Sequence, residues 1–279
     1  MVLDCGETTR LGRGLKKGGK LVPLSIRTSI DSLKRFYSLC QKKGVQEIAA
    51  VGTHALRMAR DADPFIQQVH KECNITPCVI SEKEEALLSF QSVQQDPRMP
   101  SSAVVMDVGG GSTEYIFRMV EDPSQPLHVI SLPLGALHLT EEFLHDDPPS
   151  HDAVTKLHQA IGKALLRIPP IIEGELVGIG GTAATLGSMH LGLEAFDQER
   201  IHGLQLTIDK LRAQVEELQE KDLPTRQQIR GLQTERADII LAGAMIILST
   251  MERLKKNVIH ISCRGLRYGL FYQRFMGAE

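Results

Sequence analysis

The 279-residue chain lacks any apolar run long enough to cross a lipid bilayer. Its most apolar stretch, Ile239 to Leu248, has ten residues and is flanked by Asp238 and Glu252. That length suits a buried helix, because a membrane helix needs about 20 apolar residues. The N-terminal residues also lack the apolar segment of a signal peptide. A cytoplasmic protein with no membrane partner is therefore predicted.

Cysteine is scarce and irregularly spaced, which argues against a disulfide framework. The five cysteines contain no CxxC pair, and they are an odd number. Reduced thiols in a cytoplasmic protein are the simplest interpretation. Cys73 and Cys78 have no second pair of ligands nearby, which argues against a zinc site.

The chain also lacks a strong net charge. Its 32 basic and 34 acidic residues give a charge of −2, so nothing draws the whole protein to DNA or to a membrane surface. An anionic ligand must then be held by local positive groups. A basic cluster occurs near the N-terminus, and a solvated loop is the simpler interpretation of it. Its members are Arg10, Arg13, Lys16, Lys17 and Lys20.

The remaining pattern alternates helices and strands and shows no internal repeat, which predicts an α/β fold. Buried or alternating apolar runs predict strands, and apolar residues at helical spacing predict helices. Strands are expected at 46–53, 76–81, 103–108, 112–120, 126–135, 175–181 and 257–262. Helices are expected at 23–43, 54–60, 63–73, 82–93, 136–144, 151–168, 182–191 and 264–276, with 208–255 mostly helical.

The stretch MDVGGGSTEY carries an acid, three consecutive glycines and a second acid. Glycines are entropically costly within strands, so something must require bare backbone between Asp107 and Glu114. One interpretation is a tight hairpin turn with incidental acids. The other is a phosphate site, in which successive N–H groups converge on phosphate oxygens and the two carboxylates hold magnesium.

A second glycine-rich segment, GIGGTAAT, follows the strand at 175–181 and opens a helix. Thr182 is predicted to cap that helix, whose N-terminus would attract an anion. Close packing of helix on strand explains Gly180 and Gly181 equally well. Two such turns facing one ligand are a stronger indication than either alone.

Three acids open the helix at 82–93. Ser81 and Glu84 resemble a capping box, and acids at a helix N-terminus stabilise its dipole. This structural role is the stronger interpretation of Glu82, Glu84 and Glu85. A catalytic role would require one of them to activate a water molecule beside a phosphate.

Long collinear segments resemble the exopolyphosphatase / guanosine pentaphosphate phosphohydrolase family. They include VVMDVGGGSTEYIF, SLPLGALHLTEEFLHDDPPS, GIGGTAATLGSMHLGLEAFDQERIHG and ERADIILAGAMIILSTME, together with RLGRGLKKGGKL, VISEKEEALLSF and VIHISCRGLRYGLF. The resemblance implies the superfamily of actin-like ATPases, sugar kinases and heat-shock chaperones. It implies two ribonuclease-H-like lobes, with mixed sheets flanked by helices and a phosphate-binding cleft between them.

The resemblance also implies roles for individual residues. Glu85 matches the family's water-activating glutamate, and Asp107 and Glu114 match residues that help hold Mg²⁺. Residues that match phosphate-binding positions are Gly109, Gly110, Gly111, Ser112, Thr113, Arg57, Arg264 and Arg267. Gly180, Gly181 and Thr182 match a second glycine-rich loop that faces the ligand.

The N-terminal part departs from the family pattern. The family begins with a strand and a first phosphate loop of the type D-x-G-[ST]-N-[ST], which has no counterpart with the usual spacing here. We therefore expect an N-terminally incomplete first lobe over 1–88, a second lobe over 89–264, and a final helix at 265–279 that packs back on the first lobe. Upstream codons that encode the missing strand are expected. Cys263 and Tyr268 stand where the family usually has aspartate and glutamate.

The implied function is hydrolysis of terminal phosphate from inorganic polyphosphate or guanosine pentaphosphate, a reaction of the stringent response. A homodimer is plausible by the same resemblance. Two alternatives stay open. One is an ATP-dependent kinase or ATPase, since relatives in the superfamily use ATP, and the other is a catalytically impaired sensor that binds a phosphorylated nucleotide.

Overall fold

The computed structural model describes residues 3–7, 9–16, 18–119, 126–170 and 172–277. The chain divides into two compact units, Met1–Glu85 and Ala86–Glu279. The lobes expected at 1–88 and 89–264, and the expected packing of residues 265–279 on the first lobe, stay predictions. Across the described ranges, no helix combines the length and the apolarity that a membrane span requires. All five cysteines are free thiols.

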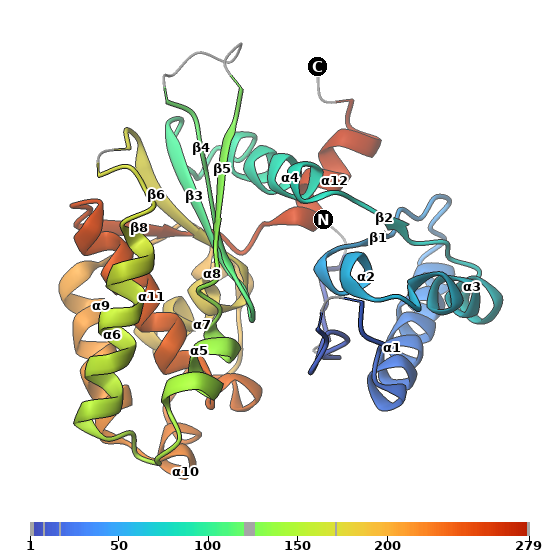
Figure 1. The fold of residues 1–279 in the computed structure, drawn as a ribbon. Helices are drawn as coiled ribbons and strands as arrows, with labels where there is room; N and C mark the ends of the chain where they lie inside the picture. Colours follow the sequence, from blue (N-terminus) through green and yellow to red (C-terminus); the bar gives the residue numbers. More distant parts are fainter. Residues whose placement is uncertain (1–2, 8, 17, 120–125, 171, 278–279) are drawn as a thin grey trace. The chain divides into compact units, whose positions relative to one another are not determined.

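The first unit is mainly helical (Figure 1). Its helices are α1 (Pro23–Lys42), α2 (His54–Met58) and α3 (Ala62–Cys73), and α1 ends before Gly44, whose φ of +66° suits a helix terminus. Two short strands, β1 (Val51–Gly52) and β2 (Cys78–Val79), pair in parallel. The unit's core is formed by apolar side chains of its helices and loops, among them Ile30, Leu56, Phe65, Val69 and Ile75.

The strand expected at 46–53 is wrong in extent and in burial. Only Val51 and Gly52 form a strand, and Ile48 is 37% exposed. The partner strand β2 has two residues, so the ladder bonds end with Cys78 N–H donating to Ala50 O and Ile80 N–H donating to Gly52 O. Apolar composition predicted a buried strand, but a strand extends only as far as its neighbour does.

The second unit is built on a six-stranded mixed sheet of order β5-β4-β3-β6-β8-β7 (Figure 1). β3 (Ala103–Val108), β6 (Glu175–Ile179) and β8 (Val258–Ile261) run parallel. β4 (Thr113–Phe117), β5 (His128–Leu132) and β7 (Leu204–Thr207) each pair antiparallel with a neighbour. The mixed α/β class predicted from the sequence is confirmed, as is the hairpin that includes the glycines. β7 was not predicted, because its four residues lie between two helices.

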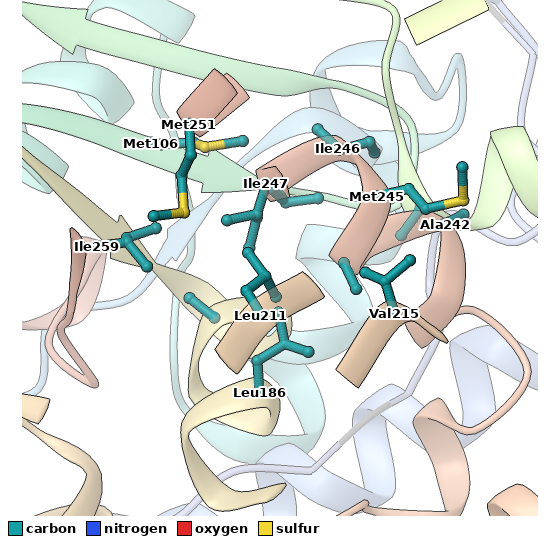
Figure 2. Close-up of a cluster of buried hydrophobic side chains, with 14 of the residues drawn as sticks. Met106, Leu186, Leu211, Val215, Ala242, Met245, Ile246, Ile247, Met251 and Ile259 are labelled. Atoms are coloured by element: carbon teal, nitrogen blue, oxygen red, sulfur yellow. The ribbon is translucent and has the colours of Figure 1, made fainter. Parts of the chain in front are cut away.

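Helices cover both faces of this sheet, and alternate residues of β3 show which layer is which. Val104, Met106 and Val108 belong to the large core, in which α5 (Ala136–Phe143), α6 (His151–Leu165), α7 (Gly180–His190), α9 (Ile208–Glu220) and α11 (Ile240–Arg253) pack. Figure 2 shows part of this core, with Met106 and Ile259 of the sheet beside Leu186, Leu211, Ile247 and Met251. Val105 contributes to the opposite face, where α4 (Glu82–Gln94) brings Ala86, Phe90 and Val93.

The remaining helical elements complete the second unit. α8 (Gln198–Ile201) precedes β7, while α10 (Leu223–Arg226) and a 3₁₀ turn, η1 (Thr234–Arg236), join α9 to α11. The apolar stretch at 239–248 consists of the N-cap residue Ile239 and the first part of α11, which is largely buried. The buried helix predicted from its length is confirmed. The last helix, α12 (Leu266–Phe275), lies against α4 (Figure 1). The contact is so close that only a glycine, Gly269, fits beside the backbone of Leu88.

Two helical glycines make matched tests of this packing. A Cβ on Gly269 of α12 would lie 1.9 Å from Leu88 O of α4, whereas a Cβ on Gly162 of α6 would meet nothing within 4 Å. We expect Gly269→Ala to lower the free energy of unfolding by about 1–3 kcal/mol, because α12 must move away from backbone that cannot yield. Gly162→Ala should raise it by about 0.5–1 kcal/mol. Urea denaturation of both variants measures the difference, and equal effects would contradict the close contact.

Candidate phosphate-binding site

The carboxyl ends of three parallel strands meet at one edge of the second unit's sheet, the usual place for a ligand in such sheets. A turn at 109–112 follows β3, α7 begins directly after β6, and residues 262–265 follow β8. In the parallel pairing of β3 with β6, Asp107 lies opposite Ile179. The structure therefore brings together the two glycine-rich segments that lie far apart in the sequence.

The turn after β3 is held by bonds to its carbonyl groups. Gly109 N–H donates to Ser112 O at 2.9 Å. Gly109 O accepts from Ala136 N at 2.9 Å, and Gly110 O accepts from His138 N at 3.0 Å, both on α5. Nothing in the described part of the chain accepts from the N–H groups of Gly110 and Gly111. Both residues are exposed, so water can bond to these two donors, and an anion that replaces the water finds two adjacent N–H groups.

The three consecutive glycines have different physical reasons. A Cβ on Gly109 would lie 3.1 Å from Ser112 O, so the turn itself favours glycine there. At Gly111 a Cβ would meet nothing within 4 Å, and none of the three has a positive φ. A tight hairpin therefore explains Gly109 but not Gly111. Bare backbone at Gly111 favours the other interpretation, the close approach of a ligand.

The second glycine-rich segment packs against the side chain of Asp107. Gly180 has a φ of +79°, and a Cβ there would lie 2.5 Å from Asp107 Oδ1. The carboxylate of Asp107 thus lies against the N-terminus of α7. The predicted cap is wrong, since Ile179 is the N-cap residue and Thr182 Oγ1 donates to Val108 O at 3.2 Å. Thr182 is the third residue of α7, and from this first turn its hydroxyl links the helix to β3.

Arg236 belongs to this site and was missed by sequence reasoning. A Cβ on Gly181 would lie 2.0 Å from Arg236 Nη2, so the guanidinium rests on the backbone at the start of α7. The 3₁₀ turn before α11 carries this arginine, and its Nε donates to Gln233 Oε1 at 3.1 Å. The motif ERADIILAG contains the residue, but nothing local in the sequence indicates its distant glycine neighbour. The result is a cation placed over a helix N-terminus that already favours anions.

Asp107 and Glu114 lie directly opposite each other in the antiparallel pair of β3 and β4. Side chains at such positions point to the same face of the sheet, with Cβ atoms about 4.5–5.5 Å apart. Ser112 Oγ and Ser131 Oγ both donate to Glu114 Oε1, at 2.6 and 3.0 Å. No group of three or more His, Cys, Asp or Glu suited to a metal occurs among the described residues. Two carboxylates with waters and phosphate oxygens are a donor set that suits magnesium, so these residues fit it.

The acids at the start of α4 have separate roles within the first unit. The capping box is confirmed: Ser81 N–H donates to Glu84 Oε2 at 2.8 Å, and Glu84 N–H donates to Ser81 Oγ at 3.2 Å. The bonds that Ser81 N–H and Ser81 Oγ donate to the Glu84 carboxylate lower the pKa of Glu84. Glu85 instead accepts from Arg57 Nη1 at 2.7 Å, and the same nitrogen donates to Ile80 O at 3.0 Å. Arg57 thus holds the predicted base in place, while Glu82, with a side chain 77% exposed, lies at the edge of the same pair, its Oε1 4.0 Å from Arg57 Nη2.

The two arginines after β8 differ in their surroundings. Arg264 Nη1 donates to Asp96 Oδ2 at 2.9 Å, and its guanidinium lies 5.3 Å from the centre of the Tyr268 ring. Arg267 is exposed on α12. Phosphate contact by either arginine stays a prediction. The guanidinium of Arg264 already pairs with a carboxylate of the protein, that of Asp96.

A buried pair fixes the turn that carries Arg264. Asp96 Oδ2 lies 2.6 Å from His202 Nε2, and both side chains are at most 1% exposed. Cys263 N–H donates to His202 Nδ1 at 3.3 Å, so the imidazole proton resides on Nε2 and faces the carboxylate. Burial lowers the pKa of His202, and the cations Arg98 and Arg264 oppose the effect of Asp96. His202 is therefore neutral where an exposed histidine would begin to protonate.

Comparison with known proteins agrees with this mixed α/β fold. The chain belongs to the Ppx/GppA phosphatase family, and the match to the family model covers residues 1–276. The crystal structure of the Aquifex aeolicus Ppx/GppA phosphatase is similar, with a TM-score of 0.81 and 31% identity, over 98% of this chain and 90% of that one. The predicted family is confirmed.

Three curated relatives give the range of names in the family. Exopolyphosphatase 1 of Mycobacterium leprae is 27% identical over 96% of this chain and 79% of its own length. Guanosine-5'-triphosphate,3'-diphosphate pyrophosphatase of Vibrio parahaemolyticus is 27% identical over 95% of this chain and 52% of its own. A bifunctional 3-dehydroquinate synthase/phosphatase of Fusobacterium nucleatum is 27% identical over 92% of this chain. The chain spans only 39% of that protein.

Gly111 separates the ligand interpretation from the hairpin interpretation. We expect Gly111→Ala to leave the free energy of unfolding unchanged or to raise it by up to about 1 kcal/mol, because the site has room and the unfolded chain loses entropy. The same change should weaken tripolyphosphate binding about tenfold, the loss of roughly one charge-assisted hydrogen bond. Calorimetric titration measures the binding. Gly6→Ala, equally free of contacts, is the control, and unchanged binding in Gly111→Ala would leave the hairpin interpretation.

The lowered pKa of His202 predicts a stability loss in mild acid. The unfolded chain binds a proton at this histidine near pH 6.5 and the folded chain only at lower pH. The contribution of His202 to stability is therefore complete above about pH 6.5 and decreases below it. We expect the free energy of unfolding to fall between pH 7 and 5.5, and to fall less in His202→Asn. His138→Gln, which changes an exposed histidine, should keep the wild-type pH dependence, and a His202→Asn curve parallel to wild type would contradict the prediction.

Proposed function

We propose that the chain hydrolyses the terminal phosphoanhydride bond of inorganic polyphosphate, of guanosine pentaphosphate, or of both. The observation that carries the proposal is the turn at 109–112. It presents two N–H donors without a protein partner, beside a pair of opposed carboxylates, in a chain of a phosphatase family. The names of the mycobacterial and Vibrio relatives support the two substrates. Both substrates end in the same chemical bond.

The second unit supplies the groups that stabilise charge on the phosphoryl group. The N–H groups of Gly110 and Gly111 donate to its oxygens, as preorganised donors that need no rearrangement during the reaction. Arg236 places a guanidinium at the start of α7, where a further phosphate of the substrate binds. The loop is rigid because α5 holds its carbonyls and Gly135 packs on it, a Cβ there lying 2.2 Å from Gly110 O.

Glu85 serves as the general base. Its carboxylate accepts the proton of the attacking water, and the hydroxide formed displaces the remaining phosphate chain in line. Arg57 fixes one carboxylate oxygen through the 2.7 Å bond, which leaves the other oxygen to face water. The partial exposure of the Glu85 side chain, 31%, is consistent with access to a water molecule.

Asp107 and Glu114 hold the divalent cation in this proposal, and Mg²⁺ is the ion that their chemistry favours. When bound, the ion neutralises charge that develops on the phosphoryl oxygens. Glu114 is oriented by the hydroxyls of Ser112 and Ser131, which both donate to its Oε1. A cytoplasmic location, in keeping with the free thiols, and a homodimer belong to the same proposal.

The substrate class is tested by incubating the protein separately with polyphosphate, guanosine pentaphosphate and ATP, and by measuring released phosphate. We expect release from one or both of the first two at a rate well above that from ATP. Turnover of ATP alone would instead establish the kinase or ATPase alternative. Binding of guanosine pentaphosphate without hydrolysis would establish the sensor.

Replacement of Glu85 by glutamine tests its role. Losing a positioned general base costs roughly 10²–10⁴ in rate, so Glu85→Gln should release phosphate that much more slowly while binding tripolyphosphate as wild type does. Steady-state phosphate release and calorimetry measure the two effects. Glu82→Gln is a matched control at the neighbouring exposed acid and should stay near the wild-type rate. Wild-type turnover in Glu85→Gln would remove Glu85 from the mechanism.

A further inference from the structure

Four exposed cations lie in or next to one backbone segment of the first unit, and we call them the basic strip: Arg13, Lys16, Lys20 and Arg60. The first three belong to the sequence RLGRGLKKGGK, residues 10–20, which contains five basic residues and no acid. In a chain whose net charge is −2, this is a local concentration of positive charge. A solvated loop would explain the composition, but it would not explain why the same segment is anchored in the core of the unit.

The segment is anchored to the protein rather than extended into solvent. Leu11 and Leu15 pack against the core of the first unit, and Leu21 is part of that core. Backbone bonds fold the chain between these anchors, with Arg13 N–H donating to Arg10 O at 2.9 Å and Gly19 N–H donating to Lys16 O at 2.8 Å. The apolar residues are thus directed inward, and the cations of the same segment stay exposed on a fixed backbone.

Arg60 joins the strip from the other side. Gly18 N–H donates to Met58 O, and Arg60 N–H donates to Gly19 O, both at 3.0 Å. These two bonds tie the basic segment to the end of α2. Arg60 therefore lies beside the segment that carries Lys20.

The strip cations are not neutralised by the protein. Among the described residues, none of the four forms a salt bridge with an acid, whereas Lys34 and Arg35 on the same unit pair with Glu72 and Glu7. Uncompensated neighbouring cations repel one another, and a polyanion relieves that repulsion. The arrangement indicates a ligand with several negative charges in a row.

The strip also lies beside the residues that hold the proposed base. A Cβ on Gly12 would lie 3.4 Å from Ala55 Cβ on α2, and α2 carries Arg57, the partner of Glu85. A chain whose terminal phosphate is attacked by water from Glu85 therefore has further phosphates available to cations of the same unit. A short substrate has fewer phosphates to offer them.

We propose that the basic strip binds the internal phosphates of a long inorganic polyphosphate chain and so makes long polyphosphate the preferred substrate. This inference rests on the proposed hydrolysis of phosphoanhydride bonds. Each cation that contacts a phosphate releases a counterion, so affinity through the strip depends steeply on salt. Binding at the glycine loop alone depends on salt much less.

The test combines three substitutions, Arg13→Gln, Lys16→Gln and Lys20→Gln, in the full chain. We expect the KM for long polyphosphate to rise at least about tenfold, or about 1.4 kcal/mol in binding. The KM for tripolyphosphate should rise much less, because its three phosphates can contact fewer cations of the strip than a long chain does. In direct binding of labelled long polyphosphate, the slope of log K against log salt concentration should fall by roughly 2–3, from about 0.7–0.9 per lost contact.

The control removes the same charge elsewhere on the first unit, with Lys42→Gln, Lys43→Gln and Lys71→Gln, and should match wild type. Equal losses for long polyphosphate and tripolyphosphate, or an unchanged salt slope, would overturn the strip. So would a control variant that weakens long-polyphosphate binding as much as the test variant does. If the wild-type protein releases no phosphate from any substrate, the proposed hydrolysis fails, and the salt slopes of binding still decide on the strip.

Discussion

Parallel pairing of β3 with β6 is the constraint on which the candidate site depends. The register that sets Asp107 opposite Ile179 makes both strands end at the same edge. Each strand is followed at once by glycines, so two bare backbone segments meet there, one as a turn and one as a helix N-terminus. A shift of that register by one residue would turn Asp107 to the other face of the sheet and separate its carboxylate from Gly180.

Glycine makes the close approaches around this edge possible. A Cβ at any of five positions would overlap atoms of a neighbouring segment, so the contacts exist only with bare backbone. They join the turn after β3 to α5, α7 to Asp107 and to Arg236, α11 to Thr182, and α12 to α4. The positions are Gly135, Gly180, Gly181, Gly243 and Gly269. Gly111 is different because nothing in the protein requires it, and this difference is what indicates a ligand.

A buried charge holds the segment at 262–265, which follows β8 at the same edge of the sheet. Asp96, with no exposed side-chain surface, contacts both His202 and Arg264, and His202 in turn accepts from the backbone of Cys263. Three segments that are distant in the sequence are joined by one carboxylate. Because a buried charge without partners is costly, the three side chains hold one another in a single arrangement. Arg264 is therefore positioned by the protein first, whatever else it contacts.

The sequence by itself determined the family, the α/β class, nearly every helix and the hairpin around the glycines. These depend on local patterns, such as apolar periodicity, the Ser81–Glu84 capping box and strands bounded by glycine, and here the tertiary structure agrees with those patterns. Tertiary structure alone decided that 46–50 is not a strand, because the neighbouring strand β2 is too short to pair with these residues. It also decided that Thr182 binds β3 rather than capping α7, and that Arg236 rests on Gly181. Those contacts join residues far apart in the chain, and their distances follow from how sheet and helices pack.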